Sequence, residues 1–138
     1  MRALALLLLP LLCLAGASHA QLAVVAGKDS SIAQLDEREV ADIFLARTTR
    51  LPDGSRVKVF ELGNDAYRAV FYREVAGKTL PQINSYWTTL IFTGKGRPPR
   101  SIGEERALVD LLNSDPHAIG YLPLDQANES VKILFIVY

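Results

Sequence analysis

Short apolar stretches typical of β-strands alternate along this chain with longer stretches of helical periodicity, and this order limits the fold more than any other feature. The strand patterns cover Leu22–Ala26, Val57–Phe60, Ala118–Tyr121 and Val131–Tyr138. The helical patterns begin at Asp36, Asp65, Thr79 and Ser101. Because strands and helices interleave, the sequence predicts a single α/β domain with a mixed β-sheet flanked by helices.

Polar residues mark the expected helix starts. Asp36 with Glu39, and Ser101 with Glu104, have the spacing of a capping box, and Thr79 is followed by Pro81 in the first turn. Apolar residues at strand and helix spacing form the predicted core: Val25, Ile43, Phe44, Val59, Val70, Trp87, Leu108, Leu111 and Ile119.

The first twenty residues are predicted to be a signal peptide, not part of the fold. Arg2 gives a basic start, Ala3–Ala15 is apolar throughout, and Ser18-His19-Ala20 places small residues where a signal peptidase reads them. The apolar run is shorter than the roughly 20 residues of a spanning helix. We therefore expect cleavage before Gln21, export to the periplasm, and one domain over residues 21–138.

The charge and the residue types that follow the predicted signal peptide limit the possible functions. Without Arg2, 14 basic and 15 acidic residues remain, which gives a net charge of −1 and no sign of nucleic-acid binding. No cysteine follows Cys13, and His117 is the only histidine after His19. Transition-metal sites use His and Cys ligands, so the sequence indicates no metal and no cofactor. No catalytic motif is present, and an enzyme is not expected.

The stretch Phe92–Arg100, "FTGKGRPPR", places glycines beside a lysine, as phosphate-binding loops do. A P-loop needs two glycines separated by four residues and then Lys and Ser or Thr, whereas here Gly94 and Gly96 are separated by one residue. Glycine and proline also mark ordinary turns. We interpret this stretch as a turn between two helices.

A second stretch, Glu61–Phe71, comes directly after a predicted strand and opens a helix. Gly63 permits a tight turn, and either Asn64 or Asp65 can cap the helix. The first N–H groups of such a helix can attract an anion, although a capped helix without a ligand is the commoner case.

The order of these motifs resembles the phosphate-binding proteins of ABC transporters. The similar stretches are "DIFLAR" at Asp42–Arg47, "GKG" at Gly94–Gly96 and "PHAIGY" at Pro116–Tyr121. The resemblance runs from about Val24 to Ala127 and matches one lobe of these two-lobed periplasmic receptors. It implies a single periplasmic-binding-protein-like lobe.

The resemblance also implies where a ligand would bind. In the family, the strand–turn–helix junction resembles R-x-D-G-S-G-T, and its arginine, aspartate and hydroxyls hold phosphate. Here the same place has Glu61 followed by Leu-Gly-Asn-Asp-Ala-Tyr, so the arginine and hydroxyls are missing. Arg68 is the nearest replacement charge. The candidate ligand contacts, expected to meet at one end of the sheet, are Ser30, Ser31, Gly63, Asn64, Asp65 and Arg68.

Two functions follow as alternatives. The first is an exported solute-binding protein that binds phosphate or another small oxyanion weakly, with a membrane permease as partner. The second is a periplasmic accessory or sensor module that reuses one receptor lobe to bind a receptor partner. A homodimer could supply the wall that the missing lobe provides in the receptors.

Overall fold

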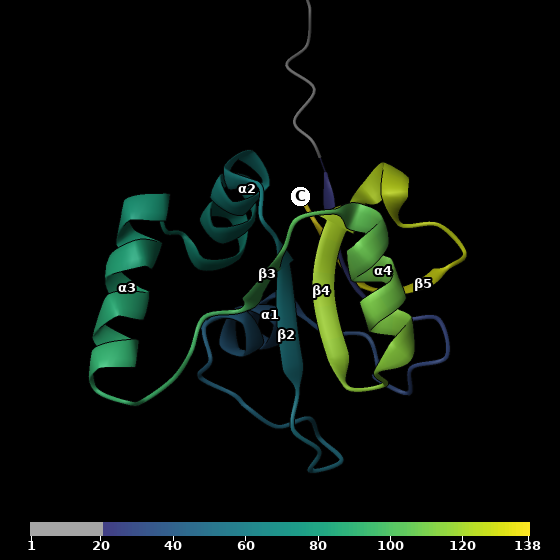
Figure 1. Ribbon diagram of the computed structural model, residues 1–138, viewed down its shortest axis with the longest axis horizontal. Helices are drawn as coiled ribbons and strands as arrows, with labels where there is room; N and C mark the ends of the chain where they lie inside the picture. Colours follow the sequence, from purple (N-terminus) through teal and green to yellow (C-terminus); the bar gives the residue numbers. More distant parts are fainter. Residues whose placement is uncertain (1–20) are drawn as a thin grey trace, which may run out of the picture.

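The computed structural model describes residues 21–138, which form one five-stranded sheet with helices on both sides (Figure 1). The strands are β1 (Leu22–Gly27), β2 (Lys58–Leu62), β3 (Arg100–Ile102), β4 (Ala118–Pro123) and β5 (Val131–Val137). The helices are α1 (Glu37–Phe44), α2 (Asp65–Ala76), α3 (Leu80–Phe92), α4 (Glu105–Ser114) and a short 3-10 turn at Leu124–Gln126. The leader predicted over residues 1–20 lies outside the described residues.

The sheet is mixed, as predicted, and its strands lie in the order β3-β2-β4-β1-β5. β2 pairs in parallel with β3 and β4, whereas β1 is antiparallel to both β4 and β5. All six residues of β1 are buried, because the strand lies between two neighbours and is covered on both faces.

The helices divide between the two faces of the sheet. α4 covers one face, and Leu108 packs closely over Gly120 of β4. On the other face, α1 and α2 pack over Tyr121 through Phe44 and Phe71. The Phe71 and Tyr121 rings stack with their centroids 4.3 Å apart. α3 stands to the side, packed against α2 and beyond the sheet edge (Figure 1).

Three of the four predicted helix starts are confirmed, since α2 begins at Asp65 as expected and the starts of α1 and α3 are capped. Asp36 and Glu39 form a complete capping box at α1, and Thr79 caps α3 with Gln82 as its partner. The predicted box at Ser101 is wrong. Ser101 lies in β3, opposite Glu61 of β2, and α4 begins later with Glu104 as an N-cap that makes no side-chain bond.

Most of the predicted core is buried. Val25, Ile43, Phe44, Trp87, Leu108 and Ile119 are buried, whereas Val59, Val70 and Leu111 are only partly covered. On α2 the buried residues are Phe71, Tyr72 and Val75, whereas the predicted core residue Val70 lies at the margin of the core. Across residues 21–138, no helix combines the length and apolar character that a membrane crossing requires.

Candidate functional site

The junction between β2 and α2 is a sharp turn at the end of a buried strand. The Gly63 amide donates a hydrogen bond of 2.9 Å to the Ile102 carbonyl oxygen of β3. A Cβ at Gly63 would lie 2.8 Å from the Ser101 hydroxyl oxygen, so glycine allows β3 to approach. The Asn64 side chain caps α2 by accepting a hydrogen bond from the Tyr67 amide at 3.1 Å. The Asp65 and Ala66 amides remain as first-turn N–H groups without an intrahelical acceptor.

Arg68 lies one turn into α2 with its side chain only 17% exposed. Its Nε is 3.1 Å from Glu61 Oε1, and its Nη1 is 3.1 Å from Asp65 Oδ1. The predicted replacement cation is therefore at the junction, but two carboxylates already compensate its charge.

Glu61 is the buried centre of this group, with 4% of the residue exposed. Besides Arg68, it accepts a hydrogen bond from the Tyr72 hydroxyl at 3.0 Å. Burial raises the pKa of Glu61, while the Arg68 charge and the Tyr72 hydrogen bond oppose the rise. Burial and the neighbouring carboxylate also raise the pKa of Tyr72. The Glu61 carboxylate thus occupies the donors that an incoming anion would need.

Sequence reasoning missed Tyr72 as a member of this group. The available signal was helical spacing, since Asp65, Arg68 and Tyr72 lie three and four residues apart and must share one face of α2. That this face packs on Glu61 depends on how the helix lies against β2, which the spacing does not reveal.

A hollow of about 520 Å³ opens beside the junction. Glu61, Asp65 and Arg68 line it on one side, and α3 faces them. Its remaining walls are Gly63, Asn84, Trp87, Thr88, Ile91, Pro98, Pro99 and Ser101. This volume is within the range of small-molecule sites. The site thus has one guanidinium, hydroxyl and amide side chains and two carboxylates around a space large enough for a small oxyanion.

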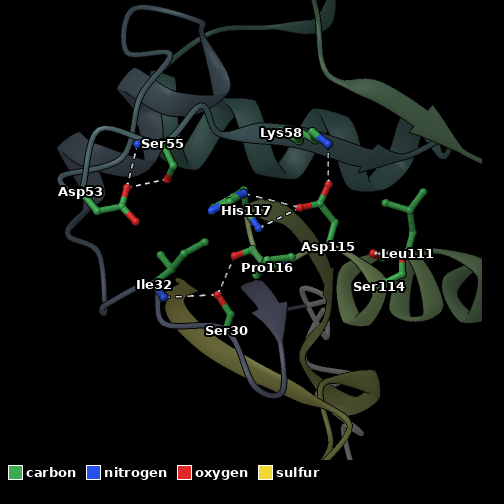
Figure 2. Close-up of polar contacts among 10 residues, drawn as sticks. All are labelled: Ser30, Ile32, Asp53, Ser55, Lys58, Leu111, Ser114, Asp115, Pro116 and His117. Atoms are coloured by element: carbon green, nitrogen blue, oxygen red, sulfur yellow. Dashed lines mark hydrogen bonds and ion pairs between the residues drawn. The ribbon is translucent and has the colours of Figure 1, made fainter.

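Ser30 and Ser31 do not belong to this site, and the expectation that they meet the junction is wrong. β1 is antiparallel to β4, so its C-terminal end lies beside the start of β4, with Ala26 opposite Ile119. β2 also starts there, with Lys58 opposite Ala118, and the junction is at its other end. The Ser30 hydroxyl donates to the Pro116 carbonyl oxygen at 3.1 Å and accepts from the Ile32 amide (Figure 2).

The polar group around His117 is structural (Figure 2). The Lys58 ammonium is 2.7 Å from Asp115 Oδ2, and the His117 amide donates to Asp115 Oδ1 at 2.9 Å. The Lys58 hydrogen bond lowers the pKa of Asp115. These contacts hold the start of β2 to the turn before β4. Within residues 21–138, no group of His, Cys, Asp and Glu side chains is arranged to hold a metal ion.

Comparisons with known proteins bear on the fold. No family model and no curated protein matches the chain. Among solved structures, an ABC-type phosphate transport receptor from Vibrio cholerae is 16% identical, with a TM-score of 0.65 over 83% of this chain and 46% of that one. A Clostridium perfringens protein crystallised with bound phosphate is also 16% identical, with a TM-score of 0.64 over 83% of this chain and 45% of that one.

PstS from Borrelia burgdorferi is 13% identical, with a TM-score of 0.56 over 83% of this chain and 47% of that one. The chain thus spans less than half the length of each of these three structures. The fold that the resemblance predicts is confirmed: this chain has the α/β fold of one part of the phosphate receptors of ABC transporters.

Proposed function

We propose that this protein is an exported solute-binding protein that binds phosphate or another small oxyanion weakly at the β2–α2 junction. The observation that carries the proposal is the position of Arg68, whose guanidinium lines the junction hollow beside the first turn of α2. Ser101 and Asn84 face the same hollow and can donate hydrogen bonds to oxyanion oxygens, whereas the Thr88 hydroxyl already donates to the Asn84 carbonyl oxygen at 2.9 Å. The fold shared with phosphate receptors supports the same ligand class.

Binding is weak because the donors are few and partly occupied. A hydrogen bond between Arg68 and an anion contributes about 1.5–3 kcal/mol, and a helix N-terminus about 0.3–1 kcal/mol. The sum is at most about 4 kcal/mol, which corresponds to a dissociation constant of about 1 mM before any ordering cost. Glu61 and Asp65 repel the anion and weaken binding further.

Calorimetric titration of residues 21–138 with phosphate tests this function, with Arg68→Ala as the variant and Arg73→Ala as its control. Arg73 is on the same helix but is exposed and pairs with Glu74. We expect a millimolar dissociation constant that Arg73→Ala leaves unchanged and Arg68→Ala weakens beyond detection. Submicromolar binding by a monomer, or no effect of Arg68→Ala, would overturn the proposal.

The second candidate function, a protein-interaction module for an exported receptor or permease, is favoured by the end of α3. Ile91 and Phe92 are 56% and 92% exposed there, which is unusual for large apolar side chains next to each other. A photo-crosslinking residue at Phe92 should capture one discrete partner, and one at the exposed Arg106 of α4 should not. The mass of the product distinguishes a permease or receptor from a second copy of this chain. Equal, diffuse crosslinking at both positions would exclude this function.

A further inference from the structure

The second hollow, of about 570 Å³, lies toward the other end of β2 and contains none of the charged or polar residues of the proposed phosphate site. It is lined by the end of α1 and the loop after it, by the residues just before β2 and one residue of that strand, and by the end of α3 with the loop to β3. The stretch "GKGRPPR" of the sequence therefore forms one of its walls. Ile91 and Pro99 separate it from the junction hollow, since both residues line both spaces.

The lining combines an apolar floor with a basic rim. The floor consists of Ile43, Phe44, Val57, Val59, Ile91 and Pro99. The rim carries Arg56, Lys95 and Arg97, with the hydroxyls of Thr48 and Thr49 beside them. Over residues 21–138, no carboxylate lines this hollow, and none of the three cations takes part in an ion pair. Their charge is uncompensated, in contrast to that of Arg68.

The loop after α3, which carries Lys95 and Arg97, is held in place by direct contacts. Gly94 ends α3 at φ +68°, and the Lys95 amide donates to the Leu90 carbonyl oxygen at 2.9 Å. Gly96 lies so close to Leu90 and Ala46 that a Cβ there would be 3.1 Å and 3.4 Å from their side chains. Pro99 is buried. These residues form a turn, as predicted, but the turn leads from α3 into β3 and not directly into a second helix. The same turn fixes Lys95 and Arg97 at the rim.

The opposite wall is tied to α3. The Tyr86 hydroxyl donates a hydrogen bond of 2.6 Å to the Leu45 carbonyl oxygen at the end of α1. The next residue, Ala46, has φ +56°, a conformation that is costly for a residue with a Cβ. The two walls are therefore joined by direct contacts, and the hollow exists without a ligand to form it.

We propose that this hollow binds an organic anion, a molecule with an apolar ring or short chain and one phosphate, sulfonate or carboxylate group. The apolar part covers the floor, and the anionic group contacts Lys95, Arg97 and Arg56. An inorganic oxyanion would leave the floor exposed to water, and a neutral apolar molecule would leave the cations without a partner. Only a molecule with an apolar part and an anionic group contacts both the apolar floor and the basic rim.

The experiment is titration of residues 21–138 with 1-naphthyl phosphate, followed by calorimetry and by backbone amide chemical shifts. Inorganic phosphate and 1-naphthol are titrated in parallel to separate the contributions of charge and apolar surface. We expect naphthyl phosphate to bind at least about 10-fold more tightly than either, because each part adds its own contacts. The largest shifts should fall at Ile91, Gly94, Lys95 and Gly96.

The variants locate the site. Lys95→Gln with Arg97→Gln should weaken naphthyl phosphate binding by about 10-fold or more. Val59→Thr, at a floor residue that does not line the junction hollow, should weaken it without changing the response to phosphate. Arg106→Gln, an exposed cation on α4, is the matched control and should have no effect. Arg68→Ala should also leave naphthyl phosphate binding unchanged, which separates this site from the proposed phosphate site.

Three results would overturn the proposal. Equal affinity for naphthyl phosphate and inorganic phosphate would show that the floor contributes nothing. Shifts confined to residues 63–68 would place the ligand at the junction. A double variant at Lys95 and Arg97 that binds as well as Arg106→Gln would remove the rim from the site.

Discussion

Arg68→Ala tests the charge compensation at the junction. The substitution removes both contacts of 3.1 Å and leaves Glu61, 4% exposed, with the Tyr72 hydroxyl as its remaining side-chain donor. Removing one partner of a buried ion pair costs about 3–5 kcal/mol when the other charge stays buried. Glu61 can escape part of this penalty by taking up a proton, because burial already raises its pKa. We therefore expect Arg68→Ala to lower the free energy of unfolding by about 3 kcal/mol at neutral pH.

A double-mutant cycle with Glu61→Gln isolates the pair. Glutamine keeps an acceptor for Tyr72 but carries no charge, so the double variant has no unpaired buried carboxylate. Groups in direct contact show interaction energies of about 0.5–3 kcal/mol. We expect Arg68→Ala to lower the free energy of unfolding clearly less in the Glu61→Gln background than in the natural sequence, as measured by urea unfolding.

The pH dependence gives a second measure of the same pair. A carboxyl whose folded pKa is raised contributes stability below its unfolded pKa, near 4.5, and loses it as pH rises through the folded value. Arg68→Ala removes the cation that holds this pKa down, so the variant should lose more stability between pH 5 and pH 8 than the natural protein does. The extra loss should vanish in the double variant. Additive effects within about 0.5 kcal/mol and a cost independent of pH would refute the pairing.

Two further predictions concern the core and the leader. Trp87 is 5% exposed, and Trp87→Ala should lower the free energy of unfolding by about 3–5 kcal/mol. Phe92 lies on the same helix but is 92% exposed, so Phe92→Ala should change the free energy of unfolding by less than about 0.5 kcal/mol. Similar values for the two variants would contradict the packing of α3. The mass of protein recovered from the periplasm should correspond to a chain beginning at Gln21, and a chain that retains Met1 would exclude cleavage.

The parts of the fold that could be predicted are those written in local sequence. The capping box at Asp36 involves residues three apart, Pro81 follows the helix start at Thr79 by two residues, and the buried strand at Leu22 is a continuous apolar run. The capping box predicted at Ser101 was wrong because the residue that pairs with Ser101 is distant in sequence. Pairing with β2 keeps the Ser101 backbone extended, although the spacing from Ser101 to Glu104 fits a helix cap. Local spacing cannot reveal such a pairing.

In the candidate site, too, local sequence predicted some members, whereas others depend on the tertiary structure. Gly63, Asn64, Asp65 and Arg68 could be placed together because they are neighbours in one strand–turn–helix unit. Ser30 could not, because the antiparallel direction of β1 moves its loop to the opposite end of the sheet, and an apolar run carries no direction. The buried contact between Glu61 and Tyr72 likewise depends on how α2 lies on β2.

The most direct test of weak, charge-compensated anion binding is the phosphate affinity of Glu61→Gln, with Glu74→Gln as an exposed control on α2. Two unit charges about 7 Å apart repel by about 0.6 kcal/mol in water and about 2.4 kcal/mol at an effective dielectric constant of 20. Removing the Glu61 charge should therefore tighten phosphate binding by roughly 3- to 50-fold, and the release of Arg68 acts in the same direction. We predict millimolar binding by the natural protein and by Glu74→Gln, and clearly tighter binding by folded Glu61→Gln. Unchanged or weaker binding by that variant would contradict the account.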